Sequence, residues 1–171
     1  STLAIANILQ TTQTRLGRPS SIIKDAGFLA NHIIVSGCDS NFQIFVDEIR
    51  RPSANGEAYH PVLIVHEHIP VSWNYLVESY NDVYYYSGTI TNMSSLNKLN
   101  VKNAFSVALM SARTAISTVD EVHVNTETLF TFLKLEQHIP PGVHVTVELT
   151  SPSNMAVLNA TIMRRIRETL E

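Results

Sequence analysis

The residues that could carry chemistry in this chain gather where predicted strands end, and the first group lies in HIIVSGCDSNF, residues 32–42. A run of β-branched residues ends at Gly37, and a helical pattern begins a few residues later. A strand, a glycine turn and a helix in this order are typical of dinucleotide-binding folds. The second and third glycines of that fingerprint are absent, however, and Asp39 would repel a diphosphate at the helix N-terminus. We therefore expect no bound cofactor at this turn.

Two further residues extend the same predicted crevice. Glu67 and Gly88 follow the second and third predicted strands. Because the carboxyl ends of parallel strands meet at one edge of a sheet, both should lie near Gly37 and Asp39. Glu67 could accept a hydrogen bond from a ribose hydroxyl. It lies thirty residues beyond Gly37, however, whereas the acid of the fingerprint lies about twenty residues beyond the glycines. This crevice leaves a nucleotide or NAD sensor, or an oxidoreductase domain, as the alternative function.

Histidines, a cysteine and a lone glutamate offer metal or nucleophile chemistry, but no pattern is complete. His60, His66 and His68 lack a matching cysteine pair or carboxylate spacing, so surface histidines at a strand end are favoured over a zinc site. Cys38 could be an activated nucleophile at a helix N-terminus, although a small buried cysteine is the more usual outcome. Glu148 lies within an apolar strand and is either paired or close to a ligand or an interface. It is the single weak candidate for a metal ligand.

Hydrophobic periodicity predicts the elements that must position these residues. Strands are predicted at residues 33–35, 62–65, 83–86, 104–110 and 143–149. Helices are predicted at 42–49, 73–80, 93–99, around 129–133, and from 151 towards 170. Alternating strands and helices favour a parallel sheet, because parallel neighbours need crossover connections. The expected fold is α/β: a Rossmann-like, doubly wound, mainly parallel sheet of about five or six strands with helices on both faces.

Length and composition suggest one domain with covered surfaces. Residues 1–30 are predicted to form an N-terminal helix and linker, and residues 31–171 the α/β domain with its long final helix. Hydrophobic residues make up 44% of the chain and charged residues only 16%, which is apolar for a free-standing domain. Part of the surface is therefore expected to contact partners.

Charge and cysteine content exclude several classes of function. The formal net charge of -3 gives no electrostatic reason to expect a nucleic-acid partner. A single cysteine cannot form an internal disulfide, which favours a reducing compartment. No apolar run approaches the roughly 20 residues that a membrane-spanning helix needs. The chain starts without methionine and ends in a charged helical stretch, so we expect it to be a piece of a longer protein.

Several stretches in order resemble the RCK (regulator of potassium conductance) domains of Slo-type potassium channels. The resemblance covers about residues 31–159 and is strongest in the block at 83–112. It is carried by HIIVSG, VYYYSGTITNMSSLNKLNVKNAFSVALMSA, VHVNTETLF and VTVELTSPSNMAVLN. Within the family, the sequence is most similar to the second RCK domain of the sodium-activated, Slack-like branch.

The resemblance implies a non-enzymatic regulatory domain on the cytoplasmic face of a membrane. Such domains assemble with other RCK domains into a tetrameric gating ring that couples binding of an intracellular cation or other ligand to opening of a potassium channel pore domain. The apolar stripe of the final helix then becomes the expected interface, with residues Met155, Leu158, Ile162 and Ile166.

The family's calcium ligands are not reproduced in this sequence. Calcium needs several hard oxygen ligands, and the positions comparable to those of calcium-gated relatives are Ala108, Glu148 and Thr150. The acidic run of calcium-activated relatives would follow Asn159, where this chain continues with ATIMRRIRETLE. We therefore transfer no calcium site to this chain. A soluble subunit of a potassium uptake system, which uses related domains, is a third and weaker possibility.

Overall fold

A computed structural model describes most of the α/β region of the chain. The described residues are 21–37, 41–51, 59–91, 93–111, 118–140, 142–149, 155–156 and 158–160. The predicted N-terminal helix, Cys38 and Asp39 lie outside these residues. So do Ile162, Ile166 and the predicted C-terminal part of the final helix.

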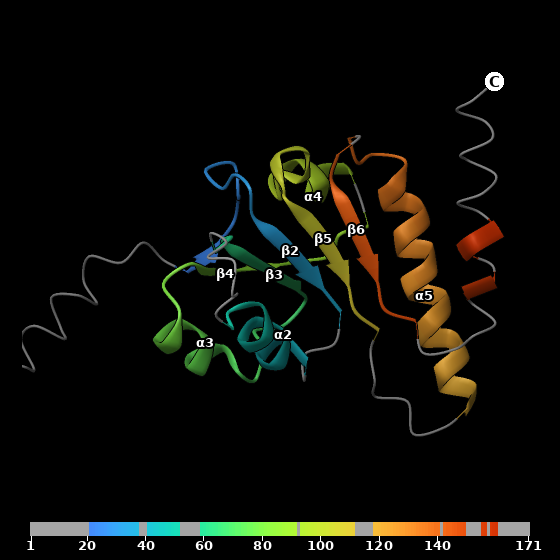
Figure 1. Cartoon of the computed structure of the whole chain (residues 1–171), viewed down its shortest axis with the longest axis horizontal. Helices are drawn as coiled ribbons and strands as arrows, with labels where there is room; N and C mark the ends of the chain where they lie inside the picture. The colour runs from blue at the N-terminus through green and yellow to red at the C-terminus, as the bar shows by residue number, and fades with distance from the viewer. Residues whose placement is uncertain are drawn as a thin grey trace, which may run out of the picture.

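The described strands form one six-stranded sheet in which all neighbours are parallel. Across the sheet the order is β1 (Ile22–Ile23), β4 (Val83–Ser87), β3 (Val62–His66), β2 (Ile33–Ser36), β5 (Ser106–Leu109) and β6 (His144–Val147). The chain thus winds outward from β2 in one direction through β3 and β4, and in the other through β5 and β6 (Figure 1). This is a Rossmann-like topology, and it confirms the predicted fold class.

Helices cover both faces of the sheet. They are α2 (Phe42–Ile49), α3 (Trp73–Ser79), α4 (Met93–Lys98), the short 3-10 helix η2 (Val101–Asn103) and α5 (Thr118–Glu136). Figure 1 shows α2 and α3 together on one face of the sheet, and α5 alongside β6. The described helices that pack on the opposite face from α2 and α3 are α4 and α5, together with η2.

Neighbouring residues of each central strand enter opposite halves of the core. Ile34 packs with α4 and α5, whereas Val35 packs with α2 and α3, and both side chains are fully buried. Side chains of a strand alternate between faces, so a strand that is covered on both sides must be apolar throughout. The unbroken runs of apolar residues in β2 and β3 follow from this burial on both faces. Edge strand β6 instead alternates exposed and half-buried residues.

Strand β1 lies within the segment that the sequence analysis assigned to a linker. Ile22 and Ile23 pair with Tyr85 and Tyr86 of β4, and Ala26 after them is completely buried. The sheet therefore begins earlier in the chain than predicted. A strand of two residues is too short to show a period of its own, so the sequence pattern could not reveal it.

One polar residue, His32, is fully buried at the start of β2. Its Nε2 lies 3.0 Å from the carbonyl oxygen of Leu99, so in the neutral ring Nε2–H donates to that oxygen. Burial lowers the pKa of His32 below the usual 6.5, because the charged ring would lose its hydration, while the bond to Leu99 opposes part of this shift. The folded chain therefore keeps His32 neutral at pH values where the unfolded chain would protonate it.

This burial predicts a loss of stability in mild acid. The unfolded state binds the extra proton below pH 6.5, so the free energy of unfolding should fall as the pH drops below that value, by at most about 1.4 kcal/mol per pH unit. Urea unfolding at pH 7.5 and pH 5.5 measures the difference. His32→Gln should remove most of this pH dependence, whereas His138→Gln, at an exposed position, should keep it. An equal slope in His32→Gln and the wild type would contradict the assignment.

Candidate functional site

A cavity of about 290 Å³ opens at the carboxyl ends of β2, β3, β4 and β5. Strand β2 has β3 on one side and β5 on the other, so the direction of winding reverses beside the cavity. In open α/β sheets, ligands bind at this reversal, where the loops after two neighbouring strands diverge. The topology alone therefore makes this cavity the candidate functional site.

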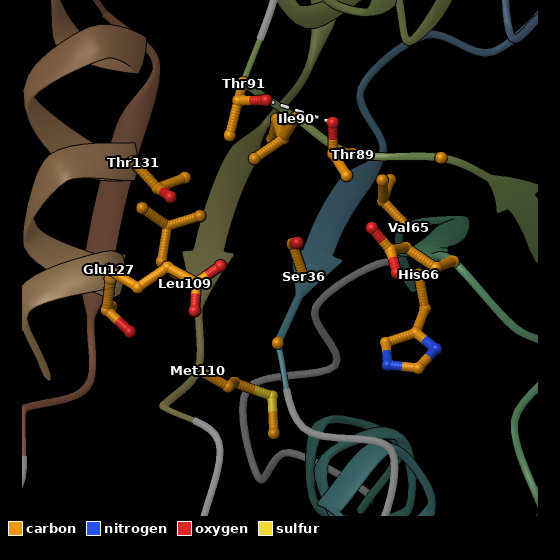
Figure 2. Close-up of a pocket in the computed structure, with 14 residues that line it drawn as sticks. Ser36, Val65, His66, Thr89, Ile90, Thr91, Leu109, Met110, Glu127 and Thr131 are labelled. Atoms are coloured by element: carbon orange, nitrogen blue, oxygen red, sulfur yellow. Dashed lines mark hydrogen bonds between the residues drawn. The ribbon is translucent and has the colours of Figure 1, made fainter. Parts of the chain in front are cut away.

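The ends of the strands supply the floor and one wall of the cavity. Figure 2 shows Ser36 of β2 lying between Leu109 of β5 and His66 of β3, with Thr89 above them. Thr89 and Thr91 follow β4, and their hydroxyl oxygens lie 3.0 Å apart, one donating to the other. Each polar side chain is thus placed by the point at which its strand leaves the sheet.

Helix α5 supplies the opposite wall. Glu127, Thr128 and Thr131 line the cavity, and Figure 2 shows Glu127 and Thr131 on the helix facing the end of β5. Thr131 shares a helical face with Glu127 and with Thr128, because it follows them by four and three positions. Leu135 on the same helix is completely buried in the core, which fixes this face of α5 against the sheet.

Gly37 is required at the cavity edge by its contact with β5. Its φ is +139°, and a Cβ atom here would overlap the Met110 carbonyl oxygen and lie 2.8 Å from the Met110 Cβ. Met110 is fixed in turn, because its amide donates to the Ser36 carbonyl at 2.8 Å. The glycine therefore lets β2 and β5 approach at their ends. In the dinucleotide fingerprint this is the place of the first glycine, which makes the tight turn after the strand.

Gly88 and its neighbours hold the loop after β3. The Gly88 amide donates to the His66 carbonyl at 3.1 Å, and the Ser87 hydroxyl donates to the Glu67 carbonyl at 3.2 Å. At Gly88, φ is +154°, and an added Cβ would lie 2.7 Å from the ring of Tyr86. These contacts tie the end of β4 to the end of β3 and so position Glu67 at the cavity.

The structure brings together Gly37, Glu67 and Gly88 of the predicted crevice, and all of them line the cavity. The fourth predicted residue, Asp39, lies outside the described residues. Thr89 was not predicted as a cavity residue, although its position just after a strand could have indicated it. The α5 residues were also missed, because no local signal says which face of a helix meets the carboxyl edge of a sheet.

Glu148 lies just after β6 and is part of the sheet's hydrogen bonding. Its Oε2 accepts a hydrogen bond from the Ser111 amide at 3.2 Å, and its own amide donates to the Leu109 carbonyl at 2.8 Å. The carboxylate therefore joins the ends of β5 and β6, which agrees with the pairing that the sequence left open. Among the described residues there is no group of three or more histidines, cysteines or carboxylates that could hold a metal ion.

The predicted histidine cluster is spread along one strand and its surroundings. His66 borders the cavity, and its Nδ1 lies 2.9 Å from the His68 carbonyl oxygen. His60 lies before the strand, where its Nδ1 donates to the Asn31 carbonyl at 2.7 Å and its ring stacks on Phe105 with centroids 4.0 Å apart. These contacts account for the histidines structurally, as the sequence analysis favoured.

The predicted interface residues have different surroundings. Met155 is 43% exposed, whereas Leu158 is only 8% exposed and packs in the core cluster that includes residues of α5. Leu158 therefore has a packing role within this chain. No helix in the described part of the chain combines the length and the apolar character that crossing a bilayer requires.

Comparison with known families gives a sequence match over most of the chain. The model of the calcium-activated potassium channel slowpoke-like RCK domain matches residues 28–159, which include β2 to β6 and every described residue that lines the cavity. A search of curated protein sequences found no significant match.

Solved structures with the same fold include the human SLO3 gating ring, at 11% sequence identity and a TM-score of 0.56 over 75% of this chain. The GsuK RCK domain is 16% identical with a TM-score of 0.54 over 88% of this chain. The GsuK channel bound to NAD is also 16% identical, with a TM-score of 0.50 over 90% of this chain. This chain spans 21%, 28% and 24% of those three chains, respectively.

Proposed function

Since this chain belongs to the family of slowpoke-like RCK domains, we propose that it is a regulatory domain in the gating ring of a potassium channel. In this role it couples the binding of an intracellular ligand, a cation or another small molecule, to opening of the pore. The proposal assigns no catalytic step to the chain. The observation that carries it is the family match across residues 28–159, which contains the whole cavity.

The proposed partners are other RCK domains of the same channel and its pore domain. Such an arrangement places the chain on the cytoplasmic face of the membrane, in a tetrameric ring. Within the family, we assign the chain to the second RCK domain of a sodium-activated, Slack-like channel. The order and spacing of VYYYSGTITNMSSLNKLN and VTVELTSPSNMAVLN support that assignment.

The cavity has the geometry that a ligand-operated switch needs. Its walls come from the ends of four strands on one side and from α5 on the other. A ligand that contacts both walls favours one position of α5 relative to the sheet, and it can shift an equilibrium only by its difference in affinity for the two states. Leu158, at the beginning of the final helix, belongs to the same core cluster as Leu129 and Phe132 of α5, so a shift of α5 would reach that helix.

A nucleotide sensor is the second candidate function. It is supported by the position of the cavity at the carboxyl edge of a Rossmann-like sheet, and by the existence of a structural relative with NAD bound. The gating-ring proposal holds whether the ligand is a cation or a nucleotide, because it concerns what the domain does after the ligand binds.

A charge on the exposed part of the final helix tests the gating-ring proposal. Met155→Glu, introduced into the complete channel, should weaken ring assembly at least about tenfold, since a buried unpaired carboxylate is costly at an apolar interface. Ala156→Glu is the matched control, because it adds the same charge at the neighbouring exposed position. Light scattering of the purified channel and patch recordings of its ligand response give the readouts. Normal assembly and an unchanged ligand response in Met155→Glu would contradict the proposed interface.

A further inference from the structure

We propose that the cavity at the carboxyl ends of β2 to β5 binds a nucleoside without a phosphate group, held by its ribose hydroxyls and by apolar contact with its base. The inference deepens the proposed function, because it names the class of ligand that the regulatory domain would sense. It depends on the charge of the lining residues, on the contact between Gly37 and Met110, and on the size of the cavity.

The described lining of the cavity has hydroxyl groups, two carboxylates and the imidazole of His66, but no lysine or arginine. Glu67 approaches from the end of β3 and Glu127 from α5, while no described lysine or arginine lines the cavity. Phosphate sites in proteins use basic side chains, helix N-termini or backbone amides, and nearby carboxylates oppose them. Two carboxylates on opposite walls therefore disfavour a phosphorylated ligand.

The backbone at the cavity edge points to the same conclusion. The Met110 carbonyl oxygen lies directly against Gly37, and both residues line the cavity where β2 ends. A carbonyl oxygen carries a partial negative charge and accepts hydrogen bonds, so it cannot replace the amide donors that bind a phosphate. The carboxylates and this carbonyl oxygen therefore both disfavour a phosphate group at this edge of the cavity.

What remains in the cavity suits a hydroxylated organic molecule. A carboxylate after the second strand of a Rossmann unit accepts hydrogen bonds from ribose hydroxyls, and Glu67 follows β3, the second strand counted from β2. Thr89, Thr91 and Thr131 can both donate and accept hydrogen bonds. Val65, Ile90 and Leu109 add apolar lining against which a flat base can pack.

The size of the cavity argues against a bare ion as its occupant. A volume of about 290 Å³ is close to the lower end of the range for small-molecule sites, which begins near about 300 Å³. A metal ion needs several ligands converging within about 2.6 Å of it. The described residues include no cluster of three or more potential metal-ligating side chains. The chemistry of the lining therefore fits a nucleoside better than a cation.

Calorimetric titration of the 171-residue chain with defined probes tests this inference. Adenosine, guanosine and uridine are the nucleoside probes, and AMP, NAD, 2′-deoxyadenosine and D-ribose are the comparisons. We expect at least one nucleoside to bind with micromolar affinity. AMP and NAD should bind about tenfold more weakly than adenosine. The reason is that each carboxylate a few ångströms from a phosphate lowers the binding affinity about threefold per unit of phosphate charge, even in water. D-ribose and 2′-deoxyadenosine should each bind with an affinity about tenfold or more below that of adenosine.

Variants of the two glutamates separate recognition from repulsion. Glu67→Gln should weaken adenosine binding about tenfold, because it removes a charged acceptor of the ribose hydroxyls. Glu127→Gln should instead reduce the ratio of adenosine affinity to AMP affinity about threefold or more, because it removes one charge that repels the phosphate. Glu78→Gln, at an exposed position on α3, is the control and should change neither value.

The inference is overturned if none of the three nucleosides binds, if AMP or NAD binds more tightly than adenosine, or if D-ribose binds as tightly as adenosine. An adenosine affinity that is unchanged in Glu67→Gln would also overturn it. Each of these results leaves the gating-ring proposal to its own test, because binding is measured on the isolated chain and assembly on the complete channel.

Discussion

Replacing Gly37 with alanine is expected to lower the free energy of unfolding by about 3 kcal/mol or more. Two effects add at this position. The φ of +139° is rarely adopted by residues with a side chain, and the new methyl group would overlap the Met110 carbonyl oxygen. The carbonyl cannot easily retreat, because the Met110 amide is hydrogen-bonded to the Ser36 carbonyl across the two strands. Urea unfolding at neutral pH measures the loss.

Gly142→Ala is the matched control for this prediction. Gly142 has a φ of +104°, but no atom lies within 4 Å of a Cβ added there. Its substitution therefore carries backbone strain without the steric overlap, and should cost only about 1–2 kcal/mol. An equal loss of unfolding free energy in the two variants would contradict the close contact between the ends of β2 and β5.

Replacing Phe42 with alanine is expected to destabilise the fold by about 3–5 kcal/mol, as for other large buried aromatic residues. Phe42 is the first residue of α2 and is completely buried, and its ring lies edge-on to His66 with centroids 5.7 Å apart. The cavity left by its removal could not close without moving α2 towards the sheet. Thermal or urea unfolding gives the change in stability.

Ile44→Ala on the same helix is the control for the Phe42 variant. Ile44 is 62% exposed, so its truncation should change the free energy of unfolding by no more than about 0.5 kcal/mol. A comparable loss in both variants would contradict the prediction, because alanine is the better helix former at both positions and only burial distinguishes them. Phe42 also bears on function, because it stands where a dinucleotide fold would have a glycine for close packing.

Local sequence pattern determined most of the elements of this protein. The apolar runs at β2 and β3 and the stripe through Phe42 and Val46 each reflect burial that repeats with the period of the element itself. The order of strands and helices then limited the topology to a parallel, doubly wound sheet, because parallel strands need crossover connections. This topology also predicts that Gly37, Glu67 and Gly88 lie at one edge of the sheet.

The side chains that complete the site are brought together by packing between elements far apart in the chain. Glu127 and Thr131 lie sixty or more residues from Glu67 in the chain, and their place in the cavity depends on how α5 rests on the sheet. Strand β1 became a strand only through its pairing with β4, since two residues carry no period. The contact that explains Gly37 is likewise with Met110, the residue that follows a different strand. Sequence periodicity records how each element meets the core, whereas contacts between elements distant in the chain are fixed by packing, and the cavity is made of such contacts.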